Sequence, residues 1–313
     1  MKQSLYSQLV AIVGEPYVKE KEPMSRYTTF QVGGFADFLV LPETIDQMKA
    51  IIQLAKKEEI PYLLLGNGSN MLVSDKGVSG IVIRFQRFQK MEVNGEEITA
   101  QAGVSLALLG RTAWKHSLTG LEFAAGIPGT LGGAIRMNAG AYGGEMKDVV
   151  TEVKVLTEEG EVLDLPAKQL EFAYRKSIVE EKNYVVLEVK MQLKQGNADE
   201  IRNYMDQLSK QRKEKQPLEY ASAGSTFKRP EGHFAGKLIQ DAGLRGFSVG
   251  DAMVSEKHCG FVINRKNATA KDILELMKYV RQEVKDKFDV LLEPEVRFIG
   301  FSEDEIQAFQ QLH

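Results

Sequence analysis

The sequence contains very little cysteine and histidine, and each shortage excludes a class of site. Cys259 is the single cysteine among 313 residues, so the chain can form no internal disulfide bond. The four histidines, His116, His233, His258 and His313, are scattered along the chain, and their spacing does not match a zinc site. We therefore expect no metal site, and we interpret His258 and Cys259 as packing residues.

An excess of basic residues and long apolar runs are also missing. The chain has 40 lysines and arginines against 43 aspartates and glutamates, which gives a net charge of -3. This balance offers no electrostatic argument for nucleic-acid binding. The apolar run near the amino terminus, Leu9 to Val13, lacks the layout of a signal peptide, and no stretch approaches the ~20 apolar residues of a membrane span. We expect a cytoplasmic protein that binds neither nucleic acid nor membrane.

Helical and strand patterns alternate along the chain and predict an α+β protein of about two domains. The helical patterns occupy residues 5–13, 44–60, 106–116, 198–216, 235–242 and 270–288. The strand patterns occupy residues 29–41, 62–65, 71–73, 80–85, 90–93, 97–102, 149–156, 161–165, 184–193 and 295–301. The composition becomes polar and charged near Gly196, so we interpret the helix over 198–216 as the hinge into a second domain. Its basic residues Lys210, Arg212, Lys213 and Lys215 are expected to favour the helix dipole.

Two glycine-rich stretches carry most of the functional information. The first, Gly66-Asn67-Gly68-Ser69-Asn70, lies between two apolar runs and is typical of a tight turn between strands. The second, GIPGTLGGAIRMNAGAYGG over residues 126–144, holds seven of the 28 glycines, which is more than a plain loop requires. Glycine permits positive φ and close approach of the backbone to a ligand, so successive N–H groups can point at one anion. Together the stretches predict a cradle for a phosphate-bearing cofactor.

The first turn differs from the fingerprint of a nicotinamide-binding site. That fingerprint needs a G-x-G-x-x-G turn leading into a helix, whereas Gly66 and Gly68 lead into a second strand. A β-hairpin turn is the ordinary alternative for this motif. Apolar residues of the second stretch could pack against a flat ring: Ile127, Pro128, Leu131 and Ala134. An adenine dinucleotide held by loops between strands is more typical of a flavin cofactor than of a nicotinamide cofactor.

Five motifs now point to a family. In order, GNGSN, GIPGTLGGAIRMNAGAYGGE, YRKS, AGSTFKRP and LEPEVRFIG resemble the motifs of the UDP-N-acetylenolpyruvoylglucosamine reductases, and the resemblance covers nearly the whole chain. It implies an FAD-binding domain of the p-cresol methylhydroxylase type over residues 1–196, with lobes at about 1–85 and 86–196. A smaller α+β substrate-binding domain is expected over residues 197–313. Because the strand ending at Leu193 follows Arg175 closely, the chain resembles the shorter form of the family, which lacks an extra loop with a substrate-covering tyrosine.

The resemblance also implies a reaction. In this family NADPH reduces, through FAD, the enolpyruvyl ether of UDP-N-acetylglucosamine to the lactyl ether of UDP-N-acetylmuramate, a step of peptidoglycan precursor synthesis. We expect noncovalent FAD, because neither glycine-rich stretch contains histidine or cysteine, and we expect a monomer that acts on a small nucleotide sugar. The residues expected to bind FAD are Gly66, Asn67, Gly68, Ser69, Asn70, Gly126, Ile127, Pro128, Gly129, Gly132, Gly133, Ala134, Asn138 and Gly140.

Three side chains are the candidate catalytic residues. By resemblance, Ser225 donates a proton to the intermediate, Arg175 polarises the substrate carboxylate, and Glu295 supports the enol form. A guanidinium matches a carboxylate bidentately, and a positioned general acid contributes ~10²–10⁴ in rate. Each residue has an ordinary alternative: Ser225 caps a turn, Arg175 pairs with Glu171 or Glu180 at the surface, and Glu295 is a solvated residue of an edge strand.

The remaining candidates concern the substrate and the class of protein. Lys228 and Arg229 could bind the UDP diphosphate or form a solvated basic pair, and Tyr142 could stack on a ring or fill the core. Another FAD-dependent oxidoreductase of the same superfamily is one alternative function. A non-catalytic nucleotide-sugar sensor is the other, although binding alone requires no proton donor such as Ser225.

Overall fold

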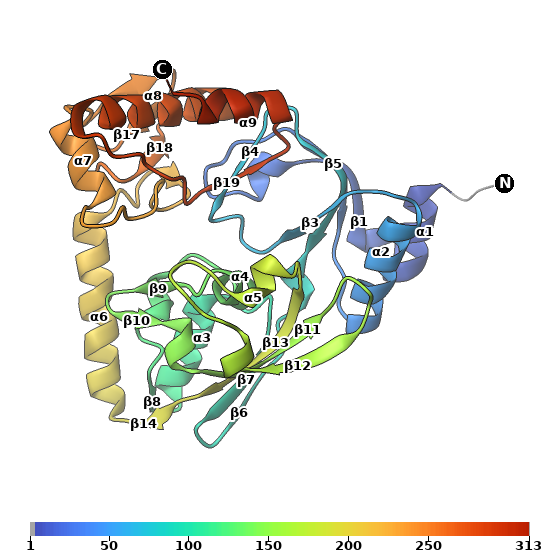
Figure 1. Ribbon diagram of the computed structural model, residues 1–313. Helices are drawn as coiled ribbons and strands as arrows, with labels where there is room; N and C mark the ends of the chain where they lie inside the picture. Colours follow the sequence, from blue (N-terminus) through green and yellow to red (C-terminus); the bar gives the residue numbers. More distant parts are fainter. Residues whose placement is uncertain (1–3, 313) are drawn as a thin grey trace. The chain divides into compact units, whose positions relative to one another are not determined.

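The computed structural model describes residues 4–312 and contains mixed helix and strand (Figure 1). The chain folds into two compact units. Unit 1 comprises Met1–Lys19, Phe38–Gly66 and Gly80–Arg212, and unit 2 comprises Glu20–Asp37, Asn67–Ser79 and Lys213–His313. Each unit is therefore assembled from three separate stretches of sequence. The predicted boundary at residue 196 separates a cofactor-binding domain from a substrate-binding domain. Because it is defined by what each part binds, it stays a prediction.

A four-stranded sheet organises the amino-terminal part of the chain. Its strand order is β1 (Val18–Pro23), β2 (Phe35–Val40), β5 (Val78–Arg84) and β3 (Tyr62–Leu65), and β3 runs parallel to β5. The helices α1 (Leu5–Val13) and α2 (Ile45–Lys57) lie together beside these strands (Figure 1). The predicted start of α2 is confirmed, because the Thr44 side chain accepts a hydrogen bond from the N–H of Gln47. One face of α2, with Met48, Ile51, Ile52 and Ala55, is buried.

A second sheet, in unit 1, is entirely antiparallel. Its order is β12 (Val162–Pro166), β11 (Val150–Leu156), β13 (Val185–Gln192), β7 (Glu97–Gln101) and β6 (Met91–Asn94). The predicted hairpin between β11 and β12 is confirmed by their pairing. Alternate residues of the central strands, including Val153, Val155, Val189 and Met191, are buried. The sheet belongs to the same core as α3 (Leu106–Lys115) and α4 (Leu131–Arg136).

Unit 2 contains a small antiparallel sheet and three helices. The sheet order is β15 (Ala221–Ser222), β18 (Val262–Asn264), β17 (Ala252–Val254) and β16 (Ser248–Val249). The helices are α7 (Ala235–Asp241), α8 (Ala270–Phe288) and α9 (Glu303–Gln310). Two distant strands, β4 (Met71–Val73) and β19 (Arg297–Ile299), pair in parallel. The apolar face of α8 is buried as predicted, with Ile273, Met277, Val280 and Val284 in the core and Leu274 partly exposed.

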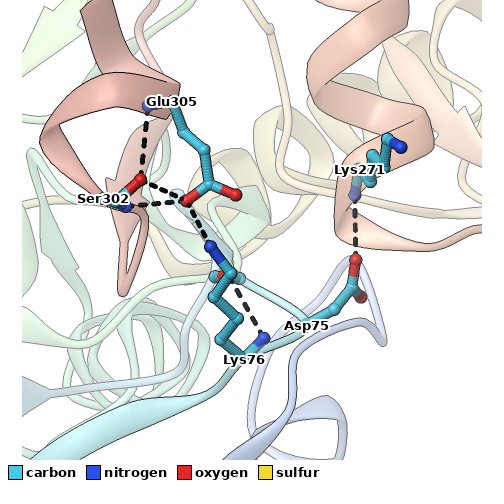
Figure 2. Close-up of polar contacts among 6 residues, drawn as sticks. Asp75, Lys76, Lys271, Ser302 and Glu305 are labelled. Carbon is cyan, nitrogen blue, oxygen red and sulfur yellow. Dashed lines mark hydrogen bonds and ion pairs between the residues drawn. The ribbon is translucent and has the colours of Figure 1, made fainter.

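Long-range polar contacts hold the ends of α8 and α9 (Figure 2). The Asp75 carboxylate accepts hydrogen bonds from the N–H groups of Ala270 and Lys271, at 2.9 and 3.0 Å. It therefore satisfies two donors of the first turn of α8 from a position about two hundred residues away in sequence. Lys76, the next residue, forms an ion pair with Glu305 of α9 at 3.1 Å.

Further helices and strands lie outside the sheets described above. The helices are α5 (Ile178–Glu181) and α6 (Ala198–Lys215). The strands are β8 (Leu118–Thr119), β9 (Gly140–Ala141), β10 (Gly144–Glu145) and β14 (Lys194–Gln195). In residues 4–312, no helix is both long enough and apolar enough to cross a membrane. Groups of three or more histidines, cysteines, aspartates and glutamates placed to hold a metal ion are likewise absent from these residues.

Two strand predictions were too long. The expected strand over 29–41 begins only at Phe35, because residues 28–32 form a turn in which the Thr28 hydroxyl donates to the Val32 carbonyl at 2.9 Å. The expected last strand over 295–301 is confined to Arg297–Ile299, and α9 follows it. Ser302 and Glu305 form a capping box at the start of α9, a signal that is visible in the sequence.

Candidate functional site

The first glycine turn, residues 66–70, connects β3 to β4 but does not form a hairpin. Because β3 pairs with β5 and β4 pairs with β19, the two strands belong to different sheets. Gly68 has a φ of +61°, and a Cβ at this position would lie 2.0 Å from the carbonyl oxygen of Tyr27. Among the described residues, the backbone N–H groups of Asn67 and Ser69 have no acceptor. The turn therefore needs glycine and keeps two donors available for a ligand.

The second stretch, called here the glycine-rich segment (Gly126–Gly144), is more ordered than the expected loop. It contains the short helix α4 and a hairpin formed by β9 and β10. Tyr142 and Gly143 form the two-residue turn of that hairpin with φ values of +53° and +89°, as a type I′ turn requires. At the start of α4, a Cβ on Gly132 would lie 2.9 Å from that of Ala102. Glycine thus lets the helix approach the chain after β7.

Gly66 brings the beginning of the first turn next to the glycine-rich segment within unit 1. A Cβ at Gly66 would lie 2.4 Å from the Thr130 hydroxyl oxygen. Thr130 immediately precedes α4 and is 6% exposed, so its side chain has little room to move. The structure thus places Gly66 beside the segment with which the sequence analysis grouped it.

The glycine-rich segment also contains an unsatisfied polar atom. In residues 4–312, the one buried side-chain nitrogen or oxygen without a hydrogen-bond partner is Nε of Arg136, at the end of α4. Burial lowers the pKa of this guanidinium. A buried donor without a partner is costly, and an acceptor on a bound molecule would remove that cost. Within unit 1, close backbone approach and a partly buried cation in this segment fit a phosphate-bearing cofactor such as FAD.

Arg212 contacts the glycine-rich segment, a role that the sequence analysis missed. It lies in the last turns of α6, where we expected it to favour the helix dipole. Its guanidinium instead donates a hydrogen bond to the carbonyl oxygen of Gly126. Burial lowers the pKa of Arg212, and nearby Tyr142 acts in the opposite direction. Arg212 therefore holds the first residue of the glycine-rich segment from a helix 86 residues further along the chain.

Arg175 lies in a tight turn of unit 1. Ala173 and Lys176 form an isolated antiparallel bridge that encloses Tyr174 and Arg175, and the φ of Arg175 is +56°. The guanidinium lies over the Tyr174 ring, with the central carbon 5.2 Å from the ring centroid. The hydrogen bond with Lys147 lowers the pKa of Glu145 most, and Asn138 and Arg175 lower it further. The charge of Arg175 thus helps to lower the pKa of Glu145, the residue that follows the glycine-rich segment.

In unit 2 the structure brings Ser225, Glu295 and the first turn together. The residue after Ser225, Thr226, is fully buried, and its N–H donates to the carbonyl of Gly260 at 2.9 Å. Its own carbonyl accepts from the N–H of Glu295 at 2.9 Å. The Asn70 side chain donates to the Glu295 carbonyl at 3.1 Å. Ser225 itself is exposed, so its hydroxyl is presented to solvent by an anchored backbone.

The other candidates lie at the surface. Lys228 pairs with Glu293 at 3.3 Å, and the Arg229 guanidinium lies 4.0 Å from the centroid of the Phe234 ring. Tyr142 is 39% exposed, which argues against a core-filling role. These three residues are accessible to a ligand.

The packing interpretation of His258 and Cys259 agrees with the structure. Cys259 is 4% exposed, and the His258 ring contacts Phe261 edge to face at 5.1 Å between centroids. Nδ1 of His258 accepts a hydrogen bond from the N–H of Gly260 at 3.1 Å. Burial lowers the pKa of His258 from its ordinary value.

Comparisons with known proteins agree with this description. Two family models match the chain: an FAD binding domain over residues 36–166, and the C-terminal domain of UDP-N-acetylenolpyruvoylglucosamine reductase over residues 216–299. The UDP-N-acetylenolpyruvoylglucosamine reductase of Clostridioides difficile is 51% identical over 299 residues, covering 95% of this chain and 98% of that protein. The protein of the same name from Caldanaerobacter subterraneus is 50% identical over 300 residues, covering 96% and 99%.

A solved structure leads to the same family. The crystal structure of UDP-N-acetylenolpyruvylglucosamine reductase from Thermus caldophilus superposes with a TM-score of 0.77 at 39% identity, covering 88% of this chain and 97% of that one. The expected α+β fold, with an FAD-binding domain of the p-cresol methylhydroxylase type and a second domain, is confirmed, and so is FAD as the cofactor. The chain belongs to the UDP-N-acetylenolpyruvoylglucosamine reductase family.

Proposed function

We propose that this chain reduces UDP-N-acetylenolpyruvoylglucosamine to UDP-N-acetylmuramate with NADPH, through bound FAD, in peptidoglycan precursor synthesis. Membership of the family over 95% of the chain supports the reaction. The observation that carries the assignment to residues is the hydrogen bond from the Glu295 N–H to the Thr226 carbonyl. This bond joins the segment that contains Ser225, the proposed proton donor, to the segment that contains Glu295, the proposed enol-stabilising residue, and it supports assigning both to one site in unit 2.

The glycine stretches supply the groups that would hold FAD. In the first turn these are the free N–H groups of Asn67 and Ser69 and the open backbone at Gly68. In the glycine-rich segment they are the backbone around α4 and the guanidinium of Arg136. The full set of FAD-binding residues stays the one proposed from the sequence. Noncovalent binding is proposed because these stretches contain no histidine or cysteine.

The reaction adds one hydride and one proton across a carbon–carbon double bond, while NADPH becomes NADP⁺. When bound, FAD would supply the hydride chemistry between NADPH and one carbon of the enolpyruvyl group. Negative charge then develops on the substrate carboxylate, and Arg175 offers a guanidinium that can bind that carboxylate bidentately. The Ser225 hydroxyl gives a proton to the other carbon, and Glu295 supports the enol form.

The remaining assignments concern substrate binding and the state of the protein. We assign the nucleotide-sugar contacts to Tyr142, Lys228 and Arg229, which are exposed or partly exposed. We infer that the chain acts as a monomer in the cytoplasm, where its nucleotide-sugar substrate would be made. Size-exclusion chromatography with light scattering tests the monomer, because a mass near twice 35.0 kDa would contradict it.

Replacing Ser225 with alanine tests the proton-donor role. Reduction of the bound flavin by NADPH should stay at the wild-type rate, whereas reoxidation by the enolpyruvyl sugar should slow by ~10²–10⁴-fold. Stopped-flow absorbance of each half-reaction measures both rates separately. Ser222→Ala, three residues away, is the matched control. Unchanged reoxidation in Ser225→Ala would show that the proton comes from another group.

A further inference from the structure

Arg175 has a backbone conformation that needs support from its surroundings. Its φ of +56° lies in the left-handed region, which is uncommon and unfavourable for residues other than glycine. The turn is closed by two hydrogen bonds, from the Ala173 N–H to the Lys176 carbonyl at 3.1 Å and from the Lys176 N–H to the Ala173 carbonyl at 3.3 Å. Contacts from outside the turn add to these two hydrogen bonds.

Those contacts come from the glycine-rich segment, at both ends of the turn. Before Arg175, the side-chain amide of Asn138 donates to the Ala173 carbonyl at 3.1 Å. After Arg175, the hydroxyl of Ser177 donates to the Arg136 carbonyl at 2.8 Å, and Ser177 is fully buried. Two residues of the segment, Arg136 and Asn138, therefore anchor the turn that carries the proposed carboxylate-binding guanidinium.

Asn138 connects three parts of unit 1 with one side chain. Besides Ala173, its Nδ2 donates to the Glu145 carboxylate at 2.9 Å, and its Oδ1 accepts from the N–H of Lys147 at 3.0 Å. It is 1% exposed and has a φ of +43°, a region that asparagine tolerates better than most residues. Both of its N–H donors are thus used within the chain. The role of Asn138 in binding FAD stays a prediction, and its backbone would make that contact.

We propose that Asn138 is a positioning residue for Arg175: it holds the Ala173–Lys176 turn so that the guanidinium meets the substrate carboxylate in a bidentate geometry. The physical reason is entropic, because a long side chain on a loose turn samples many orientations and only a few allow two parallel hydrogen bonds. Loss of such positioning costs rate in the step where charge develops on the carboxylate. This inference rests on the function proposed above for Arg175.

The test variant is Asn138→Gly, which deletes the amide but keeps the positive φ accessible. In the FAD-loaded variant, flavin reoxidation by saturating enolpyruvyl sugar should slow by about 10- to 100-fold more than flavin reduction by NADPH does. Asn183→Gly is the matched control. Asn183 also has a positive φ, of +50°, and it is exposed. Its substitution should leave both half-reactions at wild-type rates.

A double substitution separates positioning from a general structural role. In an Arg175→Lys background the bidentate fork is already lost, so adding Asn138→Gly should slow reoxidation by less than about threefold. Full additivity of the two effects would overturn the inference, and so would wild-type reoxidation in Asn138→Gly. Asn138→Asp keeps the acceptor for Lys147 and is the second variant if the glycine variant does not fold. Loss of FAD from both variants would make Asn138 a folding or cofactor residue and overturn the inference.

The wild-type protein in the same experiment distinguishes a failure of the proposed function from a failure of this inference. A wild-type flavin that the sugar does not reoxidise would overturn the proposed function, and this inference with it. Normal wild-type turnover combined with unchanged Asn138 variants would overturn the inference alone.

Discussion

Removing the Arg212 guanidinium should weaken FAD binding, although Arg212 is not among the residues predicted to bind FAD. Arg212→Met keeps the apolar stem and deletes the hydrogen bond to the Gly126 carbonyl. A hydrogen bond from a charged donor contributes about 1.5–3 kcal/mol, and the lower end applies here because Arg212 is only half-buried. About 1.5 kcal/mol corresponds to roughly a tenfold change in an equilibrium constant. We therefore expect the Kd for FAD to rise about tenfold.

Titration of the FAD-free protein with FAD, followed by quenching of flavin fluorescence, measures this Kd directly. Lys210→Met is the matched control, because Lys210 lies on the same helix, carries the same charge and is exposed. Its Kd for FAD should equal that of the wild type. Equal affinity in Arg212→Met and Lys210→Met would refute the reasoning. It would mean that the glycine-rich segment holds its binding conformation without the contact from α6.

Two further predictions concern the stability of unit 2. Asp75→Ala should lower the free energy of unfolding by about 0.5–2 kcal/mol, because two N–H groups of the first turn of α8 lose their acceptor (Figure 2). Chemical denaturation measures the change, and an unaltered midpoint would show that water replaces the carboxylate at no cost. Folding lowers the pKa of His258 below its ordinary value of 6.5. As the pH falls through that ordinary value, the unfolded chain binds more protons than the folded chain, so the stability of the folded state decreases as the pH falls. His258→Asn keeps an acceptor for the N–H of Gly260 and should reduce the fall in melting temperature between pH 7.5 and pH 5.5. The control is His233→Asn, at an exposed residue, which should retain the wild-type fall. Equal slopes of melting temperature against pH in the two variants would contradict this assignment.

Local signals predicted those parts of the fold that depend on residues close in sequence. The start of α2 follows from Thr44 and Gln47, and the buried face of α8 follows from the apolar spacing along that helix. The strand over 29–41 was overestimated because β-branched and aromatic residues favour extended structure equally inside and outside a sheet. The helix α4 was missed because Gly132 and Gly133 reduce helix propensity, and its position depends on close packing against Ala102.

The candidate site was predicted at the level of motifs, and its supporting contacts were not. The Glu295 N–H donates to the carbonyl of Thr226, the residue after Ser225, across about seventy residues of sequence, and no local pattern encodes this contact. The same holds for Arg212 and Gly126, and for Asn138 and Ala173. Each of these contacts joins residues that are distant in sequence and adjacent only in the folded chain. Residue type predicted the chemistry, and the tertiary structure supplied the partners.

An anaerobic absorbance experiment on the purified protein tests the proposed reaction directly. NADPH is added first, and UDP-N-acetylenolpyruvoylglucosamine is added after it. We expect NADPH to bleach the flavin absorbance band and the sugar to restore it, with formation of UDP-N-acetylmuramate. A band that bleaches and returns only when oxygen is admitted, or a protein that cannot be loaded with FAD, would contradict the proposed reaction.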